Sequence, residues 1–296
     1  RIYGLGSNDM KAGIAAIINA TKSLEPTSHK IKVALVVDEE YWSYGADKLI
    51  ESDFLKDVAY AFVPEAGEFD KRTSKQPIVL GRMGRTEYEI TIKGRSCHGA
   101  QARVNKHAIN AVHEAAKVQE ALINYCERCA KTFEEEGMSI TNSAYLSRIE
   151  GGKATLSVPE HARIILDRSF VPGEDMEKEI EAVKAAVAEA DTHPEAEITV
   201  KERYRPTKPA KSYYVRQSNP AVKGATAIVD EILGGHEYGI AYSVADENRL
   251  NDAGIPTITL GPTGEGSHAP DEWVDIASLE KLTTIYRRLA ERLFTR

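Results

Sequence analysis

One stretch, IKVALVVDEE at residues 31–40, constrains the fold of this chain more than any other. Nearly all of its first seven residues are apolar or β-branched, which predicts a strand at 31–37 buried on both faces of a parallel sheet. Asp38, Glu39 and Glu40 follow at once. Sites of open α/β sheets lie beyond the carboxyl ends of strands, and adjacent acids repel one another unless a cation or a chemical role accounts for them. The alternative is that they simply begin the next helix, where negative charge suits the helix dipole.

Composition limits the class of protein. The 296 residues can form one large domain or two ordinary ones, and 42% hydrophobic with 28% charged residues is typical of a soluble globular protein. The net charge of −7 argues against nucleic acid as a partner, and no apolar run approaches the ~20 residues that span a membrane. Three cysteines cannot all be paired, which favours the reducing cytoplasm as the location.

The first residues do not resemble the start of a mature protein. Arg1-Ile2-Tyr3-Gly4 contains neither an initiator methionine nor a signal peptide, and strand-like sequence runs directly into a glycine loop. We therefore expect the sequence to be a piece of a longer polypeptide.

The two ends of the chain predict a mostly parallel sheet flanked by helices. Strand 31–37, a helix at Tyr44–Glu51 and a strand at Val58–Val63 form a βαβ pattern. Further elements belong to the same layer structure: a helix that follows Asp9–Gly13 and runs to about Leu24, a helix at Asn219–Leu233, a strand at Thr257–Leu260 and a helix at Ala277–Phe294.

The middle of the chain has a different pattern. From Thr86 to Lys93 polar and apolar residues alternate, which is typical of an antiparallel strand with one exposed face. A helix at about Asn105–Phe133 follows, then two strand candidates near Ser139–Ile149 and Ala154–Val158, the segment Ala162–Phe170, a helix at Glu174–Ala190 and a strand at Glu197–Glu202. We interpret this order as β-α-β-β-α-β. We place this α+β domain at residues 83–203, inserted between 1–82 and 204–296, with Arg205–Lys211 as the return linker.

Acidic residues follow the predicted strands. Glu39 and Glu40 follow one strand, Glu65 follows the next, and Asp9 lies in the glycine loop before a helix. His268 follows a later strand and a glycine-rich turn. Carboxylates and one imidazole from separate strand ends indicate a divalent metal site, although a single histidine in a loop is also commonly a surface residue.

Four motifs, in order along the chain, carry a resemblance to a known family. They are YGLGSNDMKAG (3–13), VVDEEYWSYGA (36–46), VPEAGE (63–68) and GSHAPDEWVDI (266–276). Together they resemble the dinuclear zinc amidohydrolases, a family that includes acetylornithine deacetylase, succinyl-diaminopimelate desuccinylase, aminoacylase and glutamate carboxypeptidase. The resemblance spans essentially the whole chain and implies a zinc-peptidase-like catalytic domain with an inserted ferredoxin-like dimerisation and lid domain.

The resemblance also implies roles for individual residues. Asp9 would bridge two Zn²⁺ ions (Co²⁺ or Mn²⁺ as substitutes), Glu40 and His268 would complete one site, and Glu65 would hold the other. Glu39 would be the general base, since zinc lowers the pKa of bound water toward ~7 and a nearby carboxylate can take the proton as hydroxide attacks the carbonyl. The implied activity is hydrolysis of amide bonds in N-acyl amino acids or small peptides. The glutamate at position 65 favours a deacylase or carboxypeptidase over an aminopeptidase.

Two further residues match family positions in the inserted domain. His98, in SCHGA, matches a histidine that reaches the active site of the partner subunit and stabilises the oxyanion, which implies a homodimer. Arg168 matches an arginine that binds the carboxylate of the substrate. The alternatives are a hydrogen-bonded strand-end histidine and an ordinary surface salt bridge.

The sequence departs from the family pattern at three places. No histidine is followed two residues later by aspartate in the way of the family's first metal motif, so Glu39 also lacks its orienting aspartate. Ser157 and Ala102 stand where asparagine and proline are common. A catalytically inactive, dimeric binding or regulatory relative is therefore the alternative function. A phosphate-binding loop at Gly4-Leu5-Gly6 is a weaker one, because it lacks the P-loop lysine and serine.

Overall fold

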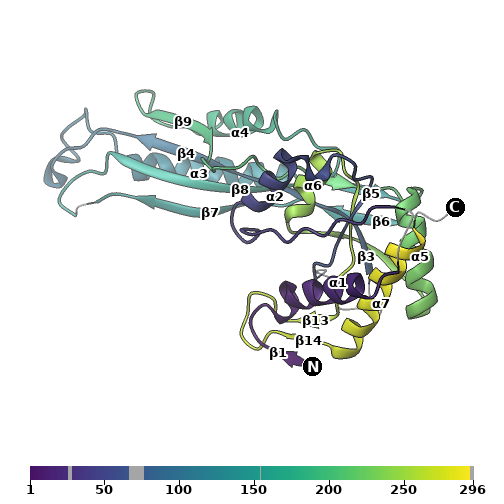
Figure 1. Ribbon diagram of the computed structural model, residues 1–296. Helices are drawn as coiled ribbons and strands as arrows, with labels where there is room; N and C mark the ends of the chain where they lie inside the picture. Colours follow the sequence, from purple (N-terminus) through teal and green to yellow (C-terminus); the bar gives the residue numbers. More distant parts are fainter. Residues whose placement is uncertain (26–28, 67–76, 154, 294–296) are drawn as a thin grey trace. The chain divides into compact units, whose positions relative to one another are not determined.

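The computed structural model describes residues 1–25, 29–66, 77–153 and 155–293. The chain divides into two compact units (Figure 1). Unit 1 comprises Arg1–Met83, Glu134–Ile140 and Ser212–Arg296, and unit 2 comprises Gly84–Phe133 and Thr141–Lys211. Within the described ranges, no helix combines the length and the apolar character that a membrane crossing requires.

Unit 1 combines helices with two sheets. Its helices are α1 (Ala12–Lys22), α2 (Tyr44–Glu51), α5 (Pro220–Leu233), α6 (Asp246–Asp252) and α7 (Ile276–Arg292). The larger sheet has the order β10-β3-β12-β2, with β11 also paired to β3; the strands are β2 (Ala61–Val63), β3 (Pro77–Arg82), β10 (Tyr213–Tyr214), β11 (Glu237–Ala241) and β12 (Thr257–Thr259). The smaller sheet has the order β1-β14-β13, formed by β1 (Ile2–Tyr3), β14 (Trp273–Val274) and β13 (Gly264–Glu265).

The larger sheet is mixed in direction. Strand β3 pairs in parallel with β11 and antiparallel with β10 and β12, whereas β12 pairs in parallel with β2. The described pairings therefore do not amount to the mostly parallel sheet that the sequence predicts.

The core of unit 1 lies where α1, α5 and α7 pack against this sheet. Ala16 and Ala20 recur every four residues on α1, and the small side chains let that helix lie beside α7 (Figure 1). Ile258 of β12 and Leu282 of α7 are completely buried in the same cluster. Burial of each such side chain stabilises the fold by about 1.5–3 kcal/mol.

Unit 2 has the β-α-β-β-α-β order that the sequence predicts. Its antiparallel sheet has the order β7-β8-β4-β9, and helices α3 and α4 pack on one face of it. The elements are β4 (Gly84–Lys93), α3 (Ala111–Arg128), β7 (Ala144–Gly151), β8 (His161–Phe170), α4 (Glu179–Ala188) and β9 (Glu197–Glu202). A hairpin of β5 (Thr132–Glu135) and β6 (Met138–Thr141) lies between α3 and β7 in the sequence, and most of it belongs to unit 1.

Strand β4 shows why this sheet is amphipathic. Tyr88, Ile90 and Ile92 point toward the helices and are at most 1% exposed. Glu89, which lies between two of them, faces away and forms a cross-strand ion pair with Arg163 at 3.1 Å. The period of two therefore separates an apolar core face from a charged outer face.

Residues 31–37, expected to form a doubly buried strand, form no strand at all. Leu35 is 57% exposed and Val37 is 74% exposed. The backbone groups of residues 31–36 form no hydrogen bond with any described residue. The prediction was wrong because apolar periodicity reports a tendency to pair, whereas a strand also requires a neighbouring strand beside it.

Other differences concern where elements begin and end. The helix expected at 105–133 begins only at Ala111, because the Asn110 side chain accepts hydrogen bonds from the Val112 and His113 amides at 3.0 and 3.3 Å. Residues 155–158 form only an isolated bridge between Ser157 and His98 instead of a strand. Residue 154 and the end of the last predicted helix at Phe294 lie outside the described residues.

Candidate metal centre

Three predicted metal ligands converge in unit 1. The Nε2 atom of His268 lies 3.0 Å from Asp9 Oδ2 and 3.0 Å from Glu40 Oε2. One ligand atom from each residue lies within 4.8 Å of the other two. Since Nε2 carries at most one hydrogen, it cannot donate a linear hydrogen bond to both carboxylates. The three ligand atoms are thus arranged around a common point, where a cation can contact all of them.

Charge also couples the three residues. Burial alone would lower the pKa of His268, but the charges of Glu40 and Asp9 and the hydrogen bonds to them raise it above its ordinary value. The side chains of His268 and Glu40 are 66% and 56% exposed, while that of Asp9 is 18% exposed. The site is therefore open on the side of His268 and Glu40.

The loop that carries Asp9 is held by Glu272. This buried carboxylate accepts hydrogen bonds from the amides of Gly6 at 2.6 Å, Asn8 at 2.8 Å and Asp9 at 2.8 Å. Burial would raise the pKa of Glu272, but these amides outweigh it and the pKa is lowered. Sequence reasoning assigned no role to Glu272, although it follows His268 in the same motif.

A compact turn presents Glu39 and Glu40. The carbonyl oxygen of Asp38 accepts hydrogen bonds from the amides of Tyr41, Trp42 and Ser43 at 3.4, 3.2 and 2.8 Å. The Asp38 side chain accepts one from the Tyr44 amide at 3.3 Å, at the start of α2. Asp38 therefore stabilises the turn and the start of α2, while Glu39 and Glu40 are available for other roles.

Glu65 follows β2 by two residues. It is buried, and burial followed by the charges of Glu247 and Asp9 raises its pKa to about 10. Two glycines leave room for the backbone at Pro64 and Glu65. A Cβ at Gly13 would lie 2.1 Å from Pro64 O, and one at Gly261 would lie 1.9 Å from Glu65 O.

Glu39 is surrounded by other acids. Burial raises its pKa to about 8, and the charges of Asp246, Glu247 and Glu40 contribute in that order. Arg82 opposes the shift. A carboxylate whose pKa lies near neutral pH can both accept and release a proton.

A buried ion pair lies close to this cluster. Arg82 donates to Glu247 at 2.8 Å and to Ser243 at 3.0 Å, and Thr259 donates to Glu247 at 2.6 Å. The side chains of Arg82 and Glu247 are 3% and 1% exposed. The sequence analysis did not predict this pair. The feature that could have indicated it is the run of charged and amide residues 246–249, which is unusual in a buried segment.

The donor set fits a divalent cation. Imidazole nitrogen and carboxylate oxygen are the ligands that zinc accepts, and the crowded acids Glu39 and Glu65 have raised pKa values that a nearby cation would reverse. Asp9, Glu40 and His268 fit one ion. For a second ion the chain offers Glu65 and the remaining oxygen of Asp9.

His98 lies in unit 2, where it is exposed and begins the short turn η3 (Gly99–Gln101). Its Nδ1 atom accepts a hydrogen bond from the Ala100 amide at 3.2 Å. In the neutral ring the N–H is then on Nε2, which no described residue contacts through a hydrogen bond. The histidine is therefore a preorganised donor.

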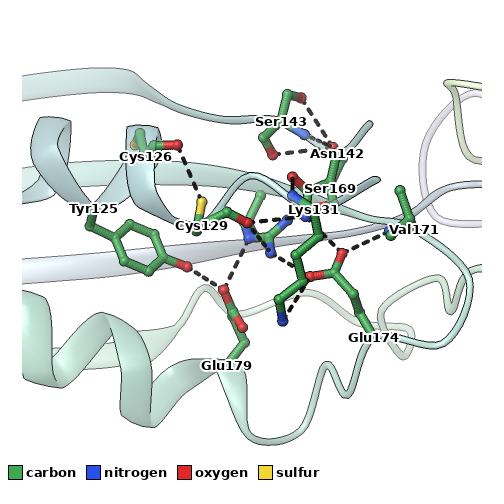
Figure 2. Close-up of polar contacts among 11 residues, drawn as sticks. Tyr125, Cys126, Cys129, Lys131, Asn142, Ser143, Ser169, Val171, Glu174 and Glu179 are labelled. Carbon is green, nitrogen blue, oxygen red and sulfur yellow. Dashed lines mark hydrogen bonds and ion pairs between the residues drawn. The ribbon is translucent and has the colours of Figure 1, made fainter. Parts of the chain in front are cut away.

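Arg168 does not fit its predicted role in binding a substrate carboxylate. Its side chain is 0% exposed, and its guanidinium forms ion pairs with Glu174 at 2.8 Å and Glu179 at 3.0 Å. Figure 2 shows these two carboxylates with their further partners, among them the hydroxyl of Tyr125 and the amide of Asn142. The cluster fastens β8 to α4 and to the segments beside it.

The physical reason lies in the strand register. Arg168 shares the helix-facing side of β8 with Ile164 and Leu166, because side chains alternate along a strand. A guanidinium on that side is enclosed by α3 and α4 and requires buried counter-charges. We assign no substrate contact to Arg168.

Comparison with known sequences defines the class of protein. Residues 1–292 match the profile of Peptidase family M20/M25/M40, and the chain belongs to this family. With deacetylase and desuccinylase relatives, it is a member of a group of metal-dependent amidohydrolases and peptidases.

Two relatives are similar along nearly the whole chain. Acetylornithine deacetylase of Pectobacterium atrosepticum is 25% identical over 287 residues, which cover 95% of this chain and 69% of the relative. Succinyl-diaminopimelate desuccinylase of Nitrosospira multiformis is 26% identical over 308 residues, covering 100% of this chain and 76% of the relative.

Solved structures agree in fold. A tripeptidase from Staphylococcus aureus has a TM-score of 0.69 with 21% identity, covering 96% of this chain and 70% of its own. Human carnosine dipeptidase 1 has a TM-score of 0.66 with 13% identity, covering 97% and 72%. At these identities the likeness establishes the mixed α/β fold with its several sheets.

Proposed function

We propose that the chain is a zinc-dependent hydrolase of amide bonds in N-acyl amino acids or small peptides. The observation that carries the proposal is the convergence of Asp9, Glu40 and His268 from three distant segments, with Glu65 and Glu39 close by. The names of the two relatives favour removal of an acyl group from an amino acid. We further propose a cytoplasmic location, which suits the three free cysteines.

The residues of the chain divide the work. Asp9, Glu40 and His268 would hold one zinc ion and Asp9 with Glu65 a second, and zinc when bound polarises a carbonyl and acidifies water. Glu39 would take the proton of the attacking water and deliver it to the leaving amine. Glu39 directly precedes the proposed ligand Glu40, which places a carboxylate beside the metal centre for this proton transfer.

We propose that His98 completes the site from a second copy of the chain. Its Nε2–H would donate a hydrogen bond to the oxyanion that forms at the substrate carbonyl. This role requires a homodimer formed through unit 2.

Metal analysis and hydrolysis assays test the function. We expect the chain to bind zinc and to hydrolyse members of a panel of N-acetyl amino acids and dipeptides. Glu39→Gln should abolish turnover while zinc is retained, and the exposed Glu51→Gln on α2 should change neither. A chain that binds no zinc refutes the proposal.

The second candidate is a non-catalytic binding or regulatory relative. Within residues 1–296 no histidine is followed two residues later by aspartate, the pattern of the family's first metal motif. Zinc binding without hydrolysis of any substrate in the panel would support this candidate instead.

A further inference from the structure

The two loops that present Asp9 and His268 are joined by a side-chain hydrogen bond. Asn8 directly precedes Asp9, and Ser267 directly precedes His268. The Nδ2 atom of Asn8 donates to the Oγ atom of Ser267 at 3.1 Å. Either orientation of the Asn8 amide keeps this bond, because a hydroxyl can both donate and accept. The bond therefore fixes the spacing of the two loops at positions one residue away from each metal ligand.

The Asn8 end of this bond is firmly held. The residue is 4% exposed, and its backbone amide donates to Glu272 at 2.8 Å. Its side chain lies against Gly264 of β13, where an added Cβ would lie 2.3 Å from Asn8 Oδ1. Because backbone and side chain are both confined, Asn8 is a fixed point next to Asp9.

The Ser267 end has little support from packing. The side chain of His268 is 66% exposed, and its φ of 62° lies in the left-handed region that residues other than glycine seldom adopt. The turn around it is closed by a hydrogen bond from the Ala269 amide to the Gly266 carbonyl at 2.9 Å. A strained, exposed turn keeps one conformation only if its surroundings hold it, and the bond of Ser267 to Asn8 does so.

Packing alone does not explain an asparagine at position 8. The Oδ1 atom of Asn8 is buried and has no hydrogen-bond partner among the described residues. Burial of an unpaired polar atom costs stability, so an apolar side chain of similar size would suit a purely structural role better. An apolar side chain, however, could not bond to the Ser267 hydroxyl.

We propose that Asn8 is a positioning residue, which through the Ser267 hydroxyl holds the turn 266–269 that presents His268 against the loop that presents Asp9. In this arrangement His268 Nε2 lies 3.0 Å from Asp9 Oδ2, so both atoms can contact one cation. The use of this spacing to bind zinc rests on the proposed function, but the link between the two loops does not.

Binding of Co²⁺, followed by its visible absorption, tests the consequence for the metal centre. Ser267→Ala should weaken Co²⁺ binding about tenfold, the usual effect of losing a residue that orients a metal ligand. Ser267→Thr keeps the hydroxyl and should retain the affinity of the wild type. The matched control is Ser23→Ala at the end of α1, which removes a hydroxyl that donates to the Ala20 carbonyl at 3.0 Å and should leave the affinity unchanged. Unchanged affinity in Ser267→Ala, or an equal loss in Ser267→Thr or Ser23→Ala, overturns the proposal.

Urea unfolding of the metal-free chain tests the link itself. Asn8→Ala, Ser267→Ala and the double variant form a cycle, in which each single variant should raise the ratio of unfolded to folded chain at least about fivefold, the effect of losing one neutral hydrogen bond. Because both variants remove the same bond, the effect of the double variant should be about fivefold smaller than the product of the two single effects. A double effect equal to that product overturns the link. If Asn8→Ala does not fold, the comparison of Ser267→Ala with Ser267→Thr decides.

These measurements distinguish failure of this proposal from failure of the proposed function. Metal binding without hydrolysis refutes the hydrolase, while the affinities of the Ser267 variants still decide the role of Asn8. A wild type that binds no metal refutes the proposed function, and the unfolding cycle then decides whether Asn8 links the two loops. Hydrolysis by the wild type together with unchanged metal affinity in Ser267→Ala refutes only the role of Asn8.

Discussion

Glu272→Gln should loosen the loop that carries Asp9. In the wild type one carboxylate oxygen accepts from the Gly6 amide and the other from the amides of Asn8 and Asp9. Glutamine keeps a single acceptor oxygen. In the better of its two orientations its NH₂ group faces the Gly6 amide, so one hydrogen bond is lost and the other two lose their charge.

The magnitude follows from these three bonds. A hydrogen bond to a charged group stabilises a protein by about 1.5–3 kcal/mol and a neutral one by about 1 kcal/mol, so we expect unit 1 to lose about 3 kcal/mol. Residues that orient metal ligands typically change metal affinity by about tenfold or more, and zinc affinity should fall by about that factor. Both tryptophans of the chain, Trp42 and Trp273, belong to unit 1, so their fluorescence during urea unfolding reports on the correct unit.

The pH dependence gives a second check. Because the pKa of Glu272 is lowered in the folded chain, its contribution is complete above the unfolded value of about 4.5 and is lost as pH falls through the folded value. The difference in the free energy of unfolding between wild type and Glu272→Gln should therefore become smaller below about pH 4.5. The exposed Glu265→Gln on β13 is the control. A loss under 1 kcal/mol at pH 7, or a difference that stays constant down to acid unfolding, would refute the reasoning.

Three further outcomes test other parts of the structure. Arg168→Met removes the guanidinium that Glu174 and Glu179 share, leaving Glu174 only the counter-charge of Lys131 at 3.4 Å among the described residues, and should destabilise unit 2 by about 3 kcal/mol in calorimetry; an unchanged transition would contradict the burial of this cluster. Without metal, the pKa of Glu65 is raised to about 10, so the folded chain holds a proton that the unfolded chain releases, and stability should fall as pH rises from about 4.5 toward 10. Melting curves between pH 6 and 9 with a chelator should show this fall, and Glu65→Gln should flatten it. His98→Ala should lower turnover about a hundredfold at constant zinc content, and mixed dimers with Glu39→Gln should regain activity; heterodimers without any recovery would exclude action across the subunits.

Elements with a local pattern could be predicted from the sequence. Helix α2 begins and ends at the predicted residues Tyr44 and Glu51, and the alternation at 86–93 identified β4 together with its buried face. The segment 31–37 shows the limit of such patterns. Its residues favour a strand, but whether another strand lies beside it is not encoded in the segment itself.

The site could be predicted only in part. Asp9, Glu40 and His268 were found through motifs that resemble a family, and the structure brings these three residues together. The residues that hold them were missed, because their roles depend on long-range burial. Glu272 is 266 residues from Gly6, and no local spacing connects the two.

Arg168 was misinterpreted although a local signal existed. It continues the alternation of Ile164 and Leu166, and Phe170 follows two residues later, so the strand period places all four on the core side. The substrate-binding role of Arg168 was taken from the family motif, although this periodicity indicated a buried side chain. An arginine within an apolar strand register is first a candidate for a buried ion pair.

The exposed segment 31–37 has a consequence for the behaviour of the chain in solution. Seven consecutive residues with one charge, high β-propensity, no proline and no glycine have the composition of segments that stack into cross-β aggregates. Its side chains and its unpaired backbone groups are both accessible to another molecule. We therefore expect concentrated solutions of this chain to aggregate through residues 31–37, and replacement of Leu35 by lysine to improve its shelf life.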